Sequence, residues 1–263
     1  MSIKLYHVDA FTHMPFSGNP AGVCLLAEER PAQWMQQVAA EMNLSETAFL
    51  WPQGADFSLR WFTPLTEVKL CGHGTLASAH VLWESGSLDK SLTAQFNTLS
   101  GKLMATLQED GIEMDFPAYV VETAEVSVEL LDALGVEAIE ILRAGAKIMI
   151  VVDGEEQVRR LQPDFAALNR LPGRSVIVTS RAESADYDFV SRNFAPWVGI
   201  DEDPVTGSAH CILGPYWAEK LGKTSLRAYQ ASARGGVLHV RPEGDRVYLR
   251  GQAVTVLVGE LLV

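Results

Sequence analysis

Two short stretches place glycine beside side chains that can bind a ligand or move a proton. Residues 71–75 read C-G-H-G-T and residues 206–209 read T-G-S-A, and each stretch stands just before an apolar run with helical spacing. The start of a helix offers unpaired N–H groups and the positive end of its dipole, and glycine lets an anion approach them. A plain helix cap is the alternative for either stretch alone. Because the pattern is doubled, we expect Gly72 and Gly207 to help hold a carboxylate.

A single carboxylate, that of Glu46, stands near the start of the apolar segment S-E-T-A-F-L-W at residues 45–51. Apolar surroundings disfavour the charged form of a glutamate and bring its proton affinity toward the range in which a general acid or base works. Glu46 is therefore the candidate proton shuttle. The alternative is a solvated or helix-capping carboxylate, which is the role of most glutamates.

Two further polar side chains lie in or beside the glycine stretches. Asp203 belongs to the acidic run D-E-D-P at residues 201–204, five residues before Ser208. An aspartate before proline is biased to extended backbone, so Asp203 could orient His73 or a substrate amine, although such runs are often solvated loops. Of the six histidines, His73 alone lies in a glycine stretch, where it could relay a proton. The others show no metal-binding spacing, so no metal site is predicted.

Two other enzyme classes fit parts of the same stretches. Residues 72–77 satisfy G-x-G-x-x-A, the dinucleotide fingerprint, which keeps a nicotinamide-dependent oxidoreductase as an alternative. A Rossmann unit needs a second parallel strand that ends in an acid, whereas this sequence continues into a hairpin pattern. A serine hydrolase is a weaker alternative, because the sequence around Ser208 lacks the second glycine of the G-x-S-x-G motif of that class.

The elements that must position these residues occur twice. Five of nine positions are identical between two segments, D-F-S-L-R-W-F-T-P at 56–64 and D-F-V-S-R-N-F-A-P at 188–196. A second match follows each segment and begins at Glu67 and at Glu202. This order predicts an internal duplication with halves at residues 1–118 and 119–263, the last strand being free to pair with the N-terminal half. Since ligands prefer crevices between domains, we expect the site where the two glycine stretches face each other.

Each half repeats the same series of elements. Apolar helices are predicted at residues 75–84 and 209–221, and each is followed by a hairpin pattern, at 101–116 and 235–250. These patterns predict an α+β fold in which mostly antiparallel strands wrap around one central helix in each half, with no βαβ unit.

Composition limits the function further. The 263 residues carry a formal charge of −12, which argues against binding to nucleic acid or to an anionic membrane surface. No apolar run approaches the length of a membrane span, and no signal peptide is recognisable. The three cysteines fit neither a disulfide framework nor a zinc pattern. We therefore expect a cytoplasmic protein with reduced thiols and a small-molecule partner.

Four segments together resemble the PhzF-like family, which is named from phenazine biosynthesis. They are F-x-G-N-P-A-G-V at 16–23, S-E-T-A-F at 45–49, F-T-P-x-x-E-V-x-L-C-G-H at 62–73 and E-D-P-V-T-G-S-A at 202–209. The resemblance covers nearly the whole chain. It implies a diaminopimelate-epimerase-like fold of two pseudo-symmetric halves, each a β-barrel-like sheet around a helix, and commonly a homodimer.

The resemblance also assigns roles to residues. In the founding enzymes of the family a glutamate, here Glu46, moves a proton between carbons of a cyclic dihydro-hydroxyanthranilate without metal or organic cofactor. The resemblance places three assisting side chains at His73, Asp203 and Ser208. On or near the turns that contact the ligand it places Asn19, Gly74, Thr75 and Gly207. The expected function is a cofactor-independent isomerase acting on a small carboxylate-bearing substrate.

One related mechanism is excluded by a single residue. Diaminopimelate epimerase and its relatives use one thiol from each half, and Cys71 stands at the first position while Thr206 occupies the second. A threonine hydroxyl is far too weak an acid to replace a thiolate. Two-thiol racemisation is therefore not expected, and Cys71 is interpreted as a small buried residue. The remaining alternative outside enzymes is a small-molecule-binding protein that keeps the site without turnover.

Overall fold

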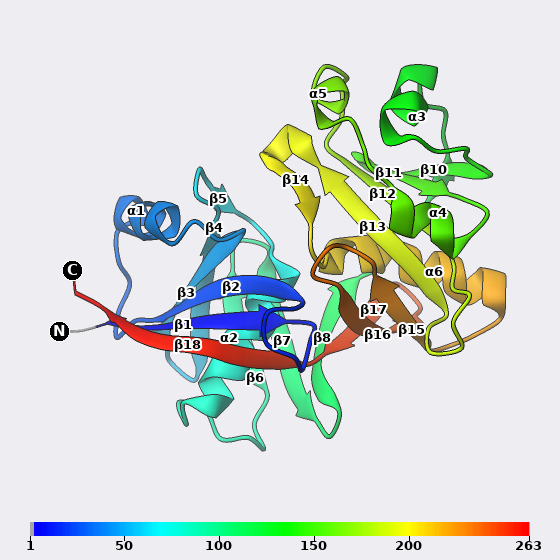
Figure 1. The fold of residues 1–263 in the computed structure, drawn as a ribbon. Coiled ribbons are helices and arrows are strands. Elements are labelled where there is room, and N and C mark those ends of the chain that lie inside the picture. The colour runs from blue at the N-terminus through cyan, green and yellow to red at the C-terminus, as the bar shows by residue number, and fades with distance from the viewer. Residues whose placement is uncertain (1–2, 263) are drawn as a thin grey trace. The chain divides into compact units, whose positions relative to one another are not determined.

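The computed structural model describes residues 3–262, and the chain divides into two compact units. The first unit comprises Met1–Phe116 and Tyr248–Val263, and the second comprises Pro117–Val247. Each unit combines a mixed β-sheet with a central helix, so the fold is α+β, the class predicted from the sequence (Figure 1). The C-terminal residues belong to the first unit because the last strand, β18, pairs with β1 along its length.

The first unit is built from eleven described elements. In chain order they are β1 (Ile3–Ala10), β2 (Asn19–Leu25), α1 (Ala32–Met42), β3 (Glu46–Gln53), β4 (Asp56–Phe62), β5 (Glu67–Val68), α2 (Gly72–Glu84), β6 (Ala94–Thr98), β7 (Gly101–Gln108), β8 (Gly111–Pro117) and β18 (Ala253–Leu261).

The second unit repeats this series with extra short helices. Its elements are β9 (Glu122–Thr123), α3 (Val128–Leu134), β10 (Glu140–Ala144), β11 (Lys147–Val151), α4 (Glu155–Arg160), α5 (Phe165–Leu168), β12 (Ser175–Arg181), β13 (Phe189–Ala195), a 3₁₀ turn (Pro196–Val198), β14 (Ile200–Asp203), α6 (Gly207–Leu221), β15 (Leu226–Gln230), β16 (Gly236–Glu243) and β17 (Arg246–Gly251), which crosses the unit boundary.

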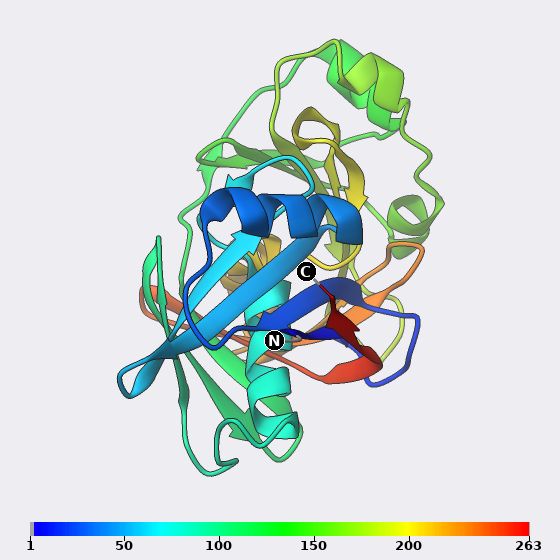
Figure 2. The same cartoon turned by 90° about the vertical axis from the view of Figure 1, so that its left-hand side faces the viewer.

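Each unit also contains two parallel strand pairs, so the prediction of no βαβ unit was wrong. In the first unit β2 pairs with β3 across α1, and β4 pairs with β6 across α2. In the second unit β11 pairs with β12, and β13 pairs with β15 across α6. Helix α1 packs against β3 and β4, the strands that follow it (Figure 2). Alternating apolar residues show that a strand exists but not the direction of its partner, which depends on the crossover.

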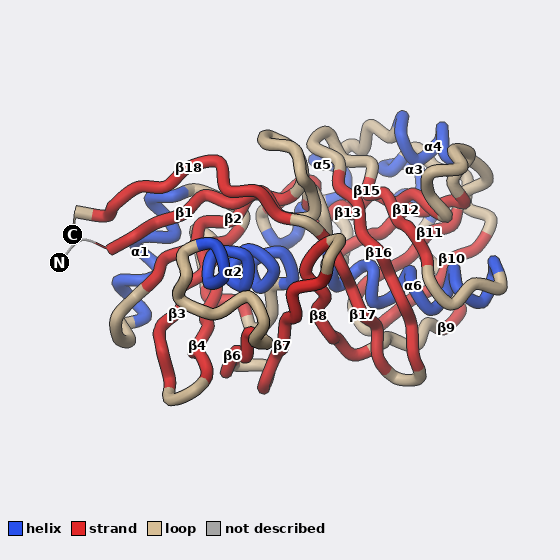
Figure 3. The backbone as a smooth tube through the Cα atoms, turned by 90° about the horizontal axis from the view of Figure 1, so that it is seen from below, coloured by secondary structure: helices blue, strands red, loops and turns tan. Residues whose placement is uncertain are grey.

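The two long central helices begin earlier than the sequence predicted, at Gly72 and Gly207. Both are buried on nearly every side, as an all-round apolar sequence requires. Helix α2 lies against β1, β2 and β3, and α6 lies against β15 and β16 (Figure 3). The approach of α6 is close at Gly214, where a Cβ atom would lie 2.5 Å from Cγ1 of Val240.

The sequence repeat corresponds to a repeated ion pair. Arg60 donates through Nε and Nη2 to the two carboxylate oxygens of Glu67, at 2.7 and 2.8 Å. Arg192 makes the same two contacts with Glu202, also at 2.7 and 2.8 Å. Each guanidinium lies over the phenylalanine ring two residues later in its strand. The repeated arginine–glutamate pair therefore joins β4 to β5 ahead of α2, and β13 to β14 ahead of α6.

We expect buried His210, on helix α6, to make the protein sensitive to acid. Burial lowers the pKa of His210 to about 4. The hydrogen bond to the Thr206 carbonyl raises this pKa, and the positive charge of Lys147 lowers it further. Between pH 6.5 and 4 the unfolded chain binds this proton more readily, so stability is full above that window and falls as the pH drops through it. The loss should be about 3 kcal/mol.

Urea unfolding of the wild type and of His210→Gln at pH 7 and pH 4.5 measures this effect. The wild type should lose more stability between the two pH values than the variant, which has no imidazole to protonate. An equal loss in both proteins would show that other groups cause the acid sensitivity.

Candidate functional site

In the first unit, Glu46, His73 and Asn19 lie together because each stands at the start of an element. Glu46 is the first residue of β3, Asn19 is the first residue of β2, and His73 is the second residue of α2. Since β2 and β3 run parallel, their starts lie at the same edge of the sheet. His73 Nε2 lies 3.2 Å from Glu46 Oε2, and His73 Nδ1 lies 3.2 Å from Asn19 Nδ2.

Hydrogen bonds around Asn19 assign the proton of His73. Ser45 Oγ donates to Asn19 Oδ1 at 3.3 Å, which leaves the amide nitrogen to donate to His73 Nδ1. In the neutral ring the proton therefore sits on Nε2, next to Glu46. That contact is not aligned as a hydrogen bond, so Oε2 of Glu46 is a buried oxygen with no hydrogen-bond partner. A carboxylate oxygen that keeps a free acceptor position can take up a proton.

The charge of His73 is set by its neighbours. Burial opposes the charged imidazolium, but the Cys71 sulfur and the Glu46 carboxylate outweigh it and raise the pKa of His73 well above its ordinary value. Burial raises the pKa of the Cys71 thiol, despite the opposing charge of His73, so this thiol stays protonated near neutral pH. These shifts favour a proton on His73 beside Glu46 and leave no thiolate base at the site.

Cys71 has a structural contact of its own at the start of α2. Its Sγ accepts a hydrogen bond from the Gly74 N–H at 3.3 Å and so caps the helix. A Cβ atom on Gly74 would lie 2.9 Å from this sulfur and 2.8 Å from Cδ1 of Trp61. The Thr75 side chain is fully buried, and its hydroxyl donates to the Cys71 carbonyl at 2.6 Å. These contacts shape the helix start whether or not a ligand also touches it.

One group of described residues could hold a metal ion. Donor atoms of Glu46, Cys71 and His73 all lie within 4.8 Å of one another. Carboxylate, thiolate and imidazole are the three ligand types that zinc uses, and three protein ligands leave a position open. The sequence did not indicate this group, because the glutamate is remote from the glycine stretch along the chain.

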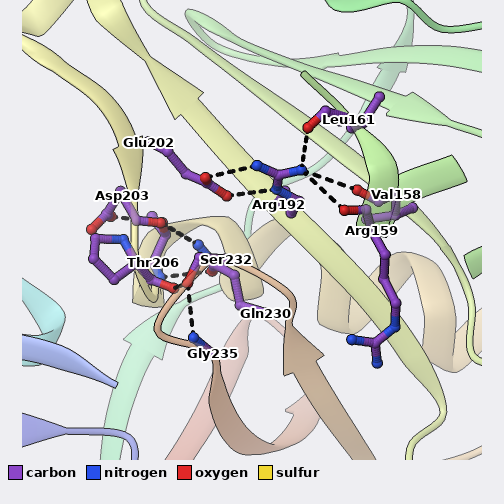
Figure 4. A network of polar contacts seen from close by, with 11 residues as sticks. Val158, Arg159, Leu161, Arg192, Glu202, Asp203, Thr206, Gln230, Ser232 and Gly235 are labelled. Carbon is purple, nitrogen blue, oxygen red and sulfur yellow. Dashed lines mark hydrogen bonds and ion pairs between the residues drawn. The ribbon is translucent and has the colours of Figure 1, made fainter. Parts of the chain in front are cut away.

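In the second unit, Asp203 and Thr206 are held by one buried amide. Asp203 Oδ2 accepts the Thr206 hydroxyl at 2.6 Å, and Gln230 Oε1 accepts the Thr206 N–H at 2.8 Å. Gln230 Nε2 donates to the Asp203 carbonyl at 2.6 Å (Figure 4). Ser232 also donates to the Pro204 carbonyl at 2.8 Å. The turn between β14 and α6 is therefore fixed by side chains from β15 and the loop after it.

Lys147 contacts Ser208, which the sequence predicted as a site residue. Lys147 is the first residue of β11, and its Nζ donates to Ser208 Oγ at 2.5 Å. Burial lowers the pKa of Lys147, while the charge of Asp203 opposes this shift. Neither Lys147 nor Gln230 was predicted from the sequence. A lysine that opens an apolar strand is common, so the pattern around it carried no signal.

The two units repeat this arrangement of side chains. Ser208 and His73 are each the second residue of a central helix, α6 and α2. Each contacts the first residue of a strand that belongs to a parallel pair, Lys147 on β11 and Asn19 on β2. The structure thus brings together the predicted residues Asn19, Glu46 and His73 in the first unit. In the second unit, the structure brings together Asp203 and Thr206, and Ser208 follows two residues later in the chain.

The fold defines the general class of the protein. A predicted epimerase from Pseudomonas aeruginosa matches the structure with a TM-score of 0.73 at 20% identity, over 99% of each chain. The molecule therefore has the diaminopimelate-epimerase-like fold, as the sequence predicted. None of the described helices combines the length and the apolar character that a membrane-spanning helix requires.

Closer relatives define the family. The phenazine biosynthesis-like family model, PhzC-PhzF, matches residues 8–259. A protein of Halalkalibacterium halodurans named an uncharacterized isomerase is 52% identical over 263 residues, 100% of this chain and 99% of that protein. The crystal structure of a PhzF-family protein from Enterococcus faecalis has a TM-score of 0.95 at 44% identity and covers 100% of both chains. This chain belongs to the phenazine biosynthesis-like (PhzF) family.

Proposed function

We propose that this protein is an isomerase in which Glu46 moves a proton between two carbons of a small carboxylate-bearing substrate, without metal or organic cofactor. One observation carries the proposal: a buried Glu46 oxygen has no hydrogen-bond partner and lies 3.2 Å from the imidazole of His73. The family of the chain supports it, because similar proteins are named isomerases.

The proposed reaction needs no co-reactant. The Glu46 carboxylate removes a proton from one carbon, and the electron pair of that C–H bond delocalises over the substrate. The resulting carboxylic acid then returns the proton to a second carbon, so the product has the same composition as the substrate. His73, whose pKa is raised, would stabilise the negative charge that develops between the two steps.

The second unit supplies the assisting residues of the proposal. By the family resemblance, Ser208, at the start of α6, would donate a hydrogen bond to an anionic group, and Asp203 would assist the proton transfer. The substrate class is inferred from the founding reaction of the family, which acts on a cyclic dihydro-hydroxyanthranilate. A homodimer is proposed from the family resemblance, and sedimentation of the purified protein would measure its mass.

Solvent deuterium tests this function directly. The purified protein is incubated in heavy water with dihydro-hydroxyanthranilate-like compounds and amino acids, and the recovered ligands are analysed by NMR for deuterium at carbon. Incorporation into at least one ligand supports an isomerase. Binding without incorporation into any ligand would favour a binding protein. In a parallel assay with added NADH or NADPH, a change in nicotinamide absorbance would favour an oxidoreductase.

We expect metal to inhibit this reaction and not to support it. Dialysis against a chelator should leave turnover unchanged, because the proposed steps use only side chains. Added zinc should inhibit by engaging Glu46, Cys71 and His73, whose donor atoms lie within 4.8 Å of one another. Turnover measured against zinc concentration, for the wild type and Cys71→Ser, checks this. The variant should need more zinc, whereas loss of turnover after chelation and recovery with zinc would contradict the proposal.

A further inference from the structure

Two loops leave the first unit's sheet at the edge where Glu46 lies. Residues 11–18 join β1 to β2, and the last residue of β1 pairs with the first residue of β2. Residues 63–66 follow β4, whose last residue pairs with the second residue of β3. Because β1, β2, β3 and β4 are neighbours in this order, the two loops lie on either side of Glu46, the first residue of β3.

Each loop carries a large apolar side chain that the rest of the described chain leaves uncovered. Phe16 is 80% exposed and Leu65 is 82% exposed, and Met14, on the same loop as Phe16, is 58% exposed. Neighbouring strands are about 4.8 Å apart, so β2 and β4 are separated by about 10 Å, with β3 between them. Side chains on loops this far apart can both contact one small molecule held at Glu46.

The backbone of the first loop is held in a strained form. Phe11 and Phe16 have φ angles of 62° and 69°, in a region that bulky residues rarely adopt. The Phe11 side chain is fully buried and packs closely on Gly251, where a Cβ atom would lie 2.4 Å from Cδ1 of the ring. The Phe16 N–H donates to Oδ2 of buried Asp9 at 2.7 Å, while its ring stays exposed. Strained residues of this kind cluster at ligand clamps, and the fold gains nothing from exposing this ring.

The second loop presents Leu65 from a closed turn. The Thr63 hydroxyl accepts the N–H groups of Leu65 and Thr66 at 3.2 and 3.0 Å, and the Thr63 N–H donates to the Thr66 carbonyl at 2.9 Å. Gln36, on α1, donates to the Thr63 carbonyl at 2.8 Å. These contacts fix the backbone of the turn without covering the Leu65 side chain. Both loops are therefore held in place by contacts within the first unit.

A small molecule suits these positions better than a second protein. The exposed apolar side chains stand on two separate loops, and the polar pair of Glu46 and His73 lies at the same edge, so the apolar surface is not one continuous patch. A stable protein interface buries about 800 Å² on each partner around an apolar centre. A ligand with a polar group and an apolar body matches the mixed surface.

We propose that Phe16 and Leu65 contact the apolar body of the ligand on which Glu46 acts, and that they make the protein prefer longer ligands over short ones. The identification of this ligand as the isomerised substrate rests on the proposed function. The contacts themselves require no proton transfer, so they are measured as binding without turnover.

A series of straight-chain carboxylates, from acetate to hexanoate, tests the proposal by NMR titration. The charged group is constant in this series, and only the apolar length changes. In the wild type each added methylene should raise the affinity by up to about four-fold, the factor that corresponds to one buried CH₂ group. Phe16→Ala and Leu65→Ala should each reduce this rise, and the double variant should remove most of it, while the affinity for acetate stays within a few-fold. Phe16→Leu keeps a large apolar side chain and should keep most of the rise.

An apolar residue at the opposite edge of the same sheet is the matched control. Leu92 is 55% exposed and lies in the loop before β6, which runs parallel to β4. Leu92→Ala should leave the rise with chain length unchanged, and circular dichroism should show the same fold in all variants.

Three results would overturn the proposal. The first is a wild type whose affinity does not rise with chain length, including one that binds no member of the series. The second is a folded double variant of Phe16 and Leu65 that keeps the rise. The third is a double variant that keeps the rise but sediments with a lower mass than the wild type, which would place both side chains in an interface between copies. Absence of deuterium incorporation would contradict the isomerase alone, because the titrations measure no turnover.

Discussion

Glu46→Gln should slow turnover by about 10²- to 10⁴-fold, the range that a single acid–base group contributes, while the ligand still binds. Glutamine keeps the size of the side chain and its place beside His73, but its amide cannot take up a proton from carbon. No neighbour replaces it, because burial raises the pKa of the Cys71 thiol and keeps that group protonated. Initial rates and binding affinities of the two proteins measure the effect.

Two variants make the Glu46 result specific. Glu41→Gln changes an exposed carboxylate on α1 and should leave the rate unchanged. Glu46→Asp keeps a carboxylate but withdraws it by one methylene, so it should retain more activity than Glu46→Gln. A rate for Glu46→Gln within a few-fold of the wild type would remove Glu46 from the mechanism.

Arg192→Met should destabilise the protein by about 3–5 kcal/mol, the usual cost of removing one partner from a buried ion pair. The Arg192 guanidinium makes two hydrogen bonds with Glu202, and its Nη1 donates to the Leu161 carbonyl at 2.7 Å (Figure 4). The side chains of the pair are only 11% and 18% exposed, so water can replace the lost contacts only in part. Urea unfolding at pH 7 measures the change.

An exposed pair on the same unit is the control for Arg192. Arg160 pairs with Glu156 one turn away on α4, and both side chains are largely exposed. Arg160→Met should therefore cost less than about 1 kcal/mol. If Arg192→Met proved no more destabilising than Arg160→Met, the repeated arginine–glutamate pair would not be a stabilising element of the fold.

The internal repeat was the part of the fold that the sequence predicted best. Its identical positions include Arg60 and Arg192, and the glutamates that follow, Glu67 and Glu202, are their ion-pair partners. The direction of strand pairing was not predictable in the same way. Residues that alternate in a strand look alike in parallel and antiparallel pairs, and the parallel pair of β2 and β3 depends on the crossover through α1.

The candidate site was predicted where chemistry and local pattern coincide. His73 and Ser208 follow glycine at a helix start, and Glu46 stands at the start of an apolar strand, so the local pattern made each of them a candidate. Lys147 was not, because its role comes from a contact with Ser208 that lies 61 residues away along the chain. Likewise, the closeness of Cys71 and Glu46 depends on tertiary packing, which local sequence does not encode.

The central claim is that a carboxyl group, and not a thiol, moves the proton. Deuterium incorporation into a substrate in heavy water, followed by NMR for Glu46→Gln and Cys71→Ser side by side, tests it most directly. We predict that Cys71→Ser incorporates deuterium at a rate within a few-fold of the wild type and that Glu46→Gln incorporates none above background. Incorporation that persists in Glu46→Gln and disappears in Cys71→Ser would contradict the account.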